Sequence, residues 1–365
     1  MSRSSFMRSW IAASIAILFL IGLVGCGPKQ PVLPVQEGTP YPQPSAVITL
    51  GTASQVKLLA TWSVGSQGEW IRSLHFSPDG KILIFIGMTT KSGTITKSTP
   101  VEFLDTTNGQ VLRTLAGLPG AVFSVSISPD GKILATAMQD GPVILWDFAS
   151  GQKLLTLTGH SMSLQPDHGC DVEFSPDGKS VFGGSPDTTL IQWDVASGQV
   201  IKTFKNQNGD VWAEAFSPDG MSMASSSADD TIVLEDVASG KVLHTLNVDD
   251  VPVGVAFSPD GKVLASGTLG TYAILWDVAT GKRLHYLNGA HSDEVKSIAF
   301  SPDGKLLADA SNDNTVVLWD VNSAKALITL KGFTHWLWGI AFSPDGRILA
   351  TSDGDGTIRI WGVAP

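Results

Sequence analysis

A repeated tetrapeptide is the strongest guide to how this chain folds. Ser-Pro-Asp-Gly occurs seven times in the 365 residues, and successive copies lie about 44 residues apart. The copies begin at Ser77, Ser128, Ser175, Ser217, Ser258, Ser301 and Ser343. A short run of alternating apolar residues precedes each copy, and further runs separated by Gly, Asp or Asn follow it. Such runs bounded by turn residues predict four short β-strands in every complete repeat.

Repetition of this unit predicts the architecture of the domain. One four-stranded sheet cannot bury both of its faces, whereas seven sheets stacked around a central axis bury their faces against one another. We therefore expect an all-β fold, a seven-bladed β-propeller with four antiparallel strands per blade, over residues 55–365. Each Ser-Pro-Asp-Gly is expected to be a tight turn in which Pro fixes φ and Gly supplies a positive φ.

The two ends of the repeated region predict how the ring closes. The last repeat stops just after its third strand, TIRIW, and so lacks an outer strand. Residues 56–62 read as an outer strand and stand before the first repeat. Because proteins avoid a bare sheet edge, we expect residues 56–62 to pair with residues 358–361 and close the ring.

The third predicted strand ends in Trp-Asp in four of the repeats. These dipeptides are Trp146–Asp147, Trp193–Asp194, Trp276–Asp277 and Trp319–Asp320. On this dipeptide and the repeat period, the chain resembles the WD-repeat family from about residue 56 to residue 361. Leu104, Glu235 and Gly362 depart from the dipeptide, and their blades are expected to be less well braced.

The resemblance implies a structural role for two groups of residues that otherwise suggest hydrolase triads. In that family, His, Ser or Thr, Asp and Trp form a hydrogen-bonded tetrad within a blade. The matching residues are His160, Ser185, Asp187 and Trp193 in one repeat and His291, Ser311, Asp313 and Trp319 in another. Because the pattern recurs and no Gly-x-Ser-x-Gly is present, we predict no catalytic residue and no enzyme.

The first 25 residues predict an export signal. Arg3 and Arg8 precede an uncharged apolar run that is short for a membrane-spanning helix. The tetrapeptide that ends at Cys26, Leu-Val-Gly-Cys, resembles the lipobox of bacterial lipoproteins. That resemblance implies a signal peptide over residues 1–25 and a lipid on Cys26. An uncleaved amino-terminal anchor is the alternative.

A proline-rich stretch follows Cys26. Residues 26–54 contain six prolines before residue 45, which predicts an extended, lipid-anchored stalk rather than a strand or helix. We therefore expect an extracytoplasmic propeller, anchored by lipid to the bacterial cell membrane or envelope.

Composition narrows the chemistry of the domain. A net charge of −10 disfavours nucleic-acid binding, since no basic stripe is available to neutralise phosphates. His168 and Cys170 fall in a long loop but supply only two zinc ligands, so no metal or cofactor is predicted. Glu173 and Glu214 are exceptions on otherwise apolar or small inner strands, and two carboxylates could serve acid–base roles.

These patterns favour a monomeric interaction scaffold of the cell envelope that binds a protein, peptide or glycan on a propeller face. A hydrolase or lyase at the central channel and a structural part of an envelope assembly machinery are the alternatives. Aromatic side chains flanked by charge at the start of the inner strands are typical interface anchors, although they could instead cap the channel. The predicted partner-binding residues are Trp70, Arg72, Phe123, Trp212, Trp336, Trp338, Lys296 and Glu294.

Overall fold

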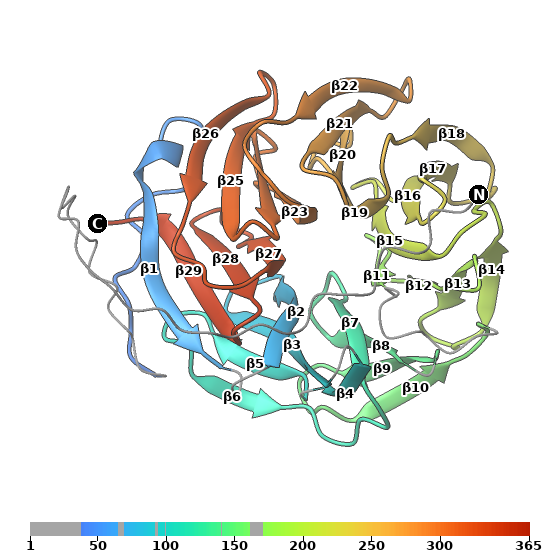
Figure 1. The fold of residues 1–365 in the computed structure, drawn as a ribbon. Coiled ribbons are helices and arrows are strands. Elements are labelled where there is room, and N and C mark those ends of the chain that lie inside the picture. Colours follow the sequence, from blue (N-terminus) through green and yellow to red (C-terminus); the bar gives the residue numbers. More distant parts are fainter. Residues whose placement is uncertain (1–37, 65–68, 92–93, 99, 140, 161–170) are drawn as a thin grey trace, which may run out of the picture. The chain divides into compact units, whose positions relative to one another are not determined.

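Seven antiparallel sheets are arranged around a central axis (Figure 1). The computed structural model describes residues 38–64, 69–91, 94–98, 100–139, 141–160 and 171–365. The predicted signal peptide, the lipidation site Cys26, and the loop residues His168 and Cys170 lie outside the described residues. The arrangement confirms the predicted all-β, seven-bladed propeller with four antiparallel strands in each blade.

The first four blades follow the order of the chain, from the inner to the outer strand. Blade 1 contains β2 (Glu69–Phe76), β3 (Ile82–Lys91), β5 (Glu102–Asp105) and β6 (Val111–Thr114), with β4 (Thr94–Ser98) paired to β3. Blade 2 contains β7 (Val122–Ile127), β8 (Ile133–Met138), β9 (Val143–Asp147) and β10 (Lys153–Leu157). Blade 3 contains β11 (Val172–Phe174), β12 (Ser180–Gly184), β13 (Leu190–Asp194) and β14 (Val200–Phe204). Blade 4 contains β15 (Val211–Phe216), β16 (Ser222–Ser227), β17 (Thr231–Asp236) and β18 (Val242–Asn247).

The remaining blades keep this order except for the last strand of the ring. Blade 5 contains β19 (Pro252–Phe257), β20 (Val263–Thr268), β21 (Ala273–Asp277) and β22 (Lys282–Leu287). Blade 6 contains β23 (Val295–Phe300), β24 (Leu306–Ser311), β25 (Thr315–Asp320) and β26 (Lys325–Leu330). Blade 7 contains β27 (Leu337–Phe342), β28 (Ile348–Asp353), β29 (Thr357–Val363) and β1 (Val56–Ser63). A short 3-10 helix, Ala53–Gln55, leads into β1.

The ring is closed by β1, which is the outer strand of blade 7. It runs antiparallel to β29, with Trp62 opposite Ile358 and Val56 opposite Val363. In Figure 1 this strand lies beside the carboxy-terminal strand at the rim of the ring. The predicted pairing of residues 56–62 with residues 358–361 is therefore confirmed.

The segment before β1 packs on the propeller, so the prediction of an extended stalk up to residue 54 is wrong for residues 38–54. Tyr41 is buried and donates a hydrogen bond from its hydroxyl to the Thr106 carbonyl at 3.0 Å. Ile48 is also buried, and its N–H donates to the Gly346 carbonyl at 2.9 Å. Composition predicted this part as unpaired because proline disfavours regular strands, but single backbone bonds and an aromatic anchor still attach it to blades 1 and 7.

Buried apolar side chains fill the spaces between neighbouring blades. In the described part of the chain they form clusters that each join one blade to the next, as when Leu275 of blade 5 meets Trp319 of blade 6. The cluster between blades 3 and 4 is small, with four buried members. Those members are Phe182, Leu190, Phe204 and Met223. Among the described residues, the buried apolar cluster between blades 3 and 4 is therefore the smallest.

The Ser-Pro-Asp-Gly turns connect the first two strands of each blade. In the first copy, the Ser77 hydroxyl donates to Asp79 at 2.6 Å and accepts the Ile82 N–H at 3.0 Å. Gly80 has a φ of 71°, the left-handed conformation that glycine adopts without strain. The predicted role of the motif as a tight turn is confirmed, and these turns place all inner strands in the same direction along the channel.

Candidate interaction surface

The inner strands share a β-bulge near their first residues. In blades 1, 2, 4, 5, 6 and 7 the register between the inner strand and its neighbour shifts at the same place. The extra residues are Arg72, Phe123, Trp212, Val253, Lys296 and Trp338. A bulge bends the strand and redirects its side chain, and bulges are common beside functional sites. Five of these six residues are in the set predicted to bind a partner.

Four of the predicted residues form one continuous contact across blades 1, 7 and 6. The rings of Trp70 and Trp338 lie 4.7 Å apart between centroids, and the Lys296 ammonium lies 5.5 Å from the centre of the Trp338 ring. The same ammonium forms a 2.6 Å ion pair with Glu294. These residues and Trp336, which precedes β27, are called the aromatic face below.

The side chains of the aromatic face differ in how far they are exposed. Trp336 is 60% exposed, which is unusual for the largest apolar side chain, whereas Trp70 and Trp338 are half-buried. Lys296 and Glu294 are half-buried as well. Tryptophans that contact one another or are exposed, beside a paired charge, have the composition of a protein-binding surface.

The other three predicted residues have different surroundings. Phe123 is 1% exposed and belongs to the core between blades 2 and 3, so its prediction as a binding residue is wrong. Arg72 lies over the ring of Phe123, with its guanidinium carbon 4.9 Å from the centroid. Trp212 is half-buried in blade 4, and its indole N–H has no hydrogen-bond partner among the described residues. Sequence alone could not separate Phe123 from Trp212, because both occupy the bulge position.

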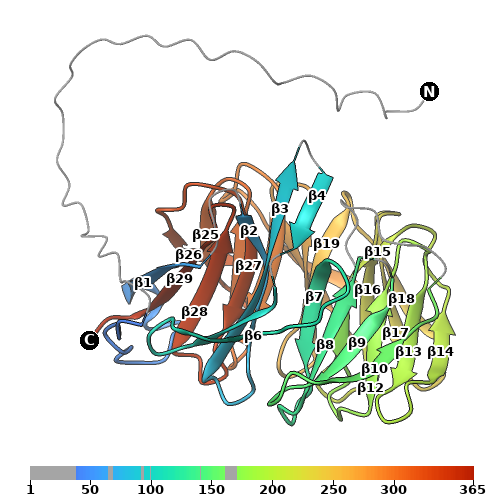
Figure 2. The same ribbon diagram turned by 90° about the horizontal axis from the view of Figure 1, so that it is seen from below.

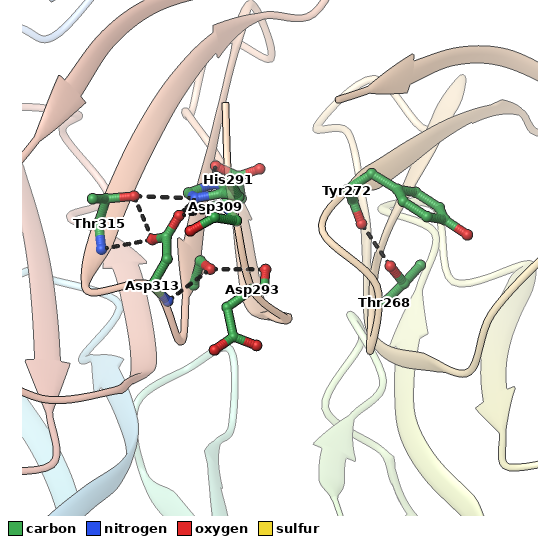
Figure 3. A network of polar contacts seen from close by, with 9 residues as sticks. Thr268, Tyr272, His291, Asp293, Asp309, Asp313 and Thr315 are labelled. Atoms are coloured by element: carbon green, nitrogen blue, oxygen red, sulfur yellow. Dashed lines mark hydrogen bonds and ion pairs between the residues drawn. The ribbon is translucent and has the colours of Figure 1, made fainter. Parts of the chain in front are cut away.

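Both predicted tetrads contain the expected contact between His and Asp. In blade 3 the Nδ1 atom of His160 lies 3.3 Å from Asp187, and in blade 6 that of His291 lies 3.1 Å from Asp313. A threonine hydroxyl, that of Thr315 in blade 6, also contacts the histidine Nδ1 (Figure 3). The histidine and aspartate assignments thus describe real contacts within each blade.

The predicted serines are not members of these networks. Ser185 and Ser311 accept the backbone N–H groups of Asp187 and Asp313, at 3.2 and 3.1 Å, in the turn after the second strand. The Ser311 hydroxyl donates to the Asp293 carbonyl at 3.0 Å. Neither hydroxyl bonds a histidine in the described residues, so the assignment of both serines to tetrads is a misplacement, and neither is arranged as a nucleophile.

The residue that meets the blade tryptophan lies two positions earlier, on the second strand. The Trp146 indole N–H donates to the Thr136 hydroxyl at 3.0 Å, and Trp276 donates to Ser266 at 3.1 Å. Blade 7 repeats the bond between Trp361 and Thr351, at 2.9 Å. In each case the hydroxyl lies ten residues before the tryptophan, and this spacing is the signal that sequence reasoning missed.

In blades 3 and 6 the position ten residues before the tryptophan is not occupied by Ser or Thr. In blade 3 it is Gly183, whose carbonyl contacts His160 Nε2 at 3.0 Å, while the Trp193 N–H donates to the Thr158 carbonyl at 2.9 Å. In blade 6 it is Asp309, whose carboxylate contacts His291 Nε2 at 3.0 Å. The Trp319 indole N–H then has no partner in the described part of the chain.

The pKa values of the two tetrad histidines shift in opposite directions. Burial is the main cause that lowers the pKa of His160, despite the nearby Asp187. Burial also acts on His291, but the bonds and charges of Asp309 and Asp313 outweigh it and raise the pKa. His291 therefore lies between two carboxylates that favour its protonated form, which is an arrangement that braces the blade.

Where Glu235 replaces the tryptophan, in blade 4, its side chain is buried and accepts a bond from the Asn206 amide. Burial raises its pKa.

In the described ranges, no group of three His, Cys, Asp or Glu side chains is placed to hold a metal ion. No helix among the described residues is long and apolar enough to cross a membrane.

The fold and the bonds between blade tryptophans and hydroxyls define a β-propeller built from Trp-containing repeats. A sequence profile for the family described as "WD domain, G-beta repeat" matches residues 109–147, 151–194, 198–234, 240–277, 281–320 and 324–362. These segments make up more than half of the chain, which therefore belongs to the WD-repeat family. Propellers of this family generally act by binding other proteins.

Curated relatives match parts of the chain. Small ribosomal subunit protein RACK1z of Arabidopsis thaliana is 46% identical over 55 residues, which are 15% of this chain and 17% of that protein. The RACK1 protein of Medicago sativa is 43% identical over 56 residues, with the same coverage. RACK1y of Oryza sativa subsp. japonica is 31% identical over 102 residues, 27% of this chain and 28% of the relative. The chain thus spans less than a third of the length of each of these relatives.

Proposed function

We propose that this protein is an interaction scaffold of a bacterial cell envelope and that it binds a partner protein, peptide or glycan on its aromatic face. The observation that carries the proposal is the contact from Trp70 through Trp338 and Lys296 to Glu294, with Trp336 exposed two residues before Trp338. Three blades contribute to this surface, and redirected bulge residues supply two of its members. Family membership supports a binding role over a catalytic one.

The test is capture of binding partners by the wild-type protein and by variants. Trp336→Ala should leave the fold intact, because the side chain is 60% exposed, and should reduce recovery of the partner at least tenfold. Trp338→Ala should do the same with some loss of stability, since it also removes the contact with Trp70. Leu243→Ala, which truncates a 44% exposed leucine on β18, is the matched control. Equal recovery from all three variants would rule out the aromatic face.

The envelope location is proposed from the sequence of residues 1–26. Arg3, Arg8, the apolar run and the cysteine at position 26 have the order of a lipoprotein signal peptide. We expect Cys26→Ser to release the protein from the membrane fraction while its near-UV circular dichroism stays unchanged. A variant that still sediments with membranes after a carbonate wash would favour a helical anchor instead.

A further inference from the structure

A carboxylate occupies a core position in blade 4. Three residues before the serine of each turn, six inner strands carry Leu, Val or Ile, and β15 carries Glu214. This side chain is 5% exposed. Its Oε1 accepts the Gly184 N–H at 3.3 Å, and its Oε2 has no hydrogen-bond partner among the described residues. A buried carboxyl with an unpaired oxygen costs free energy that an apolar residue at this position would not, so Glu214 indicates a functional constraint.

A second carboxylate lies on the neighbouring inner strand. Glu173 on β11 is half-buried, and its Oε2 lies 3.5 Å from the Ser126 hydroxyl of blade 2. Asp171, just before β11, accepts a bond from Ser124 of the same blade. In the described part of the chain neither glutamate has an ion-pair partner. The charges that act on the two glutamates come from acidic side chains. Asp171 acts on both glutamates, and Glu173 also acts on Glu214.

The surroundings disfavour ionisation of both carboxyls when no cation is bound to them. Burial, followed by the charge of Asp171, raises the pKa of Glu173 to about 8. Burial and the charges of Asp171 and Glu173 raise that of Glu214 as well. Glu214 reaches from blade 4 to Gly184 of blade 3, where the two blades share a small apolar cluster, and the charge of Glu173 acts on it. A cation placed between the two blades would supply the missing counter-charge.

The position of Glu214 on its strand places it within reach of a side chain that enters the channel from the end where the inner strands begin. Trp212 occupies the bulge of β15, and Glu214 follows it by two residues, about 7 Å further along the strand. A lysine carries its charge on a four-carbon stem, and an arginine on a slightly shorter one, so both span such a depth. A basic side chain that enters the channel beside Trp212 can therefore reach Glu214.

We propose that Glu173 and Glu214 bind the ammonium or guanidinium group of a basic side chain of a protein partner. This rests on the proposed function, since it names the chemistry of the partner that the aromatic face holds. A net charge of −10 favours a basic partner over an acidic one. A metal ion is the less suitable occupant, because no three potential ligands of the described residues converge there.

The test uses hexalysine as the probe and isothermal titration calorimetry on the full-length protein. Glu173→Gln and Glu214→Gln should each weaken hexalysine binding at least tenfold. Glu235→Gln is the matched control, because it removes a buried carboxyl of raised pKa from blade 4 that contacts Asn206 instead. All three variants replace a carboxyl of raised pKa by a neutral amide, so nonspecific attraction changes in the same way. Hexaglutamate should not bind.

A second readout is proton release. Because cation binding requires both glutamates to be ionised, wild-type titrations at pH 7 in buffers of different ionisation enthalpy should show release of protons, and Glu173→Gln should reduce it. If hexalysine fails to bind, binds without proton release, or binds all variants alike, the assignment is overturned. Calcium binding that depends on Glu173, without hexalysine binding, would overturn it in favour of a metal site.

These outcomes are independent of the proposed function. Partner capture that needs Trp336 but is unchanged by Glu173→Gln would refute the cation site and leave the aromatic face in place. Should Glu214→Gln fold poorly, the half-buried Glu173 alone carries the test, since it is not a member of the apolar cluster between blades 3 and 4.

Discussion

Deletion of β1 is expected to abolish cooperative folding of the propeller. This strand supplies the outer edge of blade 7, paired with β29 from Val56 to Ser63. Its Trp62 is fully buried and lies against Gly109 of blade 1. Loss of a buried tryptophan alone costs about 3–5 kcal/mol, out of a total domain stability of about 5–15 kcal/mol. The deletion also exposes the edge of β29, which invites aggregation.

Urea unfolding, followed by tryptophan fluorescence, measures the effect. The control is deletion of β4, residues 94–98, a strand that pairs only with β3 and lies off the four-strand path of blade 1. We expect the β4 deletion to unfold in one transition near the wild-type midpoint, and the β1 deletion to show no cooperative transition. Equal midpoints for the two deletions would mean that β1 does not hold the ring closed.

His291→Ala should cost about 3–5 kcal/mol, since removal of one partner from a buried ionic network leaves the others uncompensated. The imidazole is fully buried between Asp309 and Asp313, at 3.0 and 3.1 Å. His335 of blade 7 is the matched control: its side chain is 59% exposed and lies 3.9 Å from Asp355. His335→Ala should therefore cost less than about 1 kcal/mol.

The same network predicts how stability depends on pH. The folded state raises the pKa of His291 above its ordinary 6.5, so the folded protein binds a proton more tightly than the unfolded chain. The stability from this group is fully present below pH 6.5 and is lost as pH rises through the folded-state pKa. Denaturant midpoints of wild type and His291→Ala should converge with rising pH. A constant difference between them from pH 5 to pH 9 would show that folding does not shift the pKa of His291.

The fold was predictable because its determinants are local and repeated. Seven copies of one turn and alternating strands specify blades whatever the neighbouring blade contains, and the missing outer strand specifies closure. The docking of Tyr41 and Ile48 was not predictable, because it depends on single bonds to Thr106 and Gly346 that leave no periodic pattern. Proline content indicates that a segment does not form a regular strand or helix by itself, but it does not indicate which part of the propeller the segment packs against.

The tetrads show the same limit at the level of single residues. Ser311 and Asp309 are two residues apart on β24, so their side chains lie on the same face of the strand. The alternation of side chains along a strand therefore cannot decide which of the two belongs to the tetrad. The choice is made by the position of Trp319 on the next strand, ten residues later. In the same way, Phe123 and Trp212 share the bulge position, and only the packing of adjacent blades makes the first one core.

The role of the aromatic face can be measured by photo-cross-linking in the native envelope. A photoreactive phenylalanine derivative replaces either Trp336, on the aromatic face, or Leu243, on the outer strand β18, and both positions are well exposed at 60% and 44%. We expect irradiation to give a discrete adduct from position 336 and none from position 243. An adduct from position 243 alone would contradict the account and place the partner on the rim of the ring.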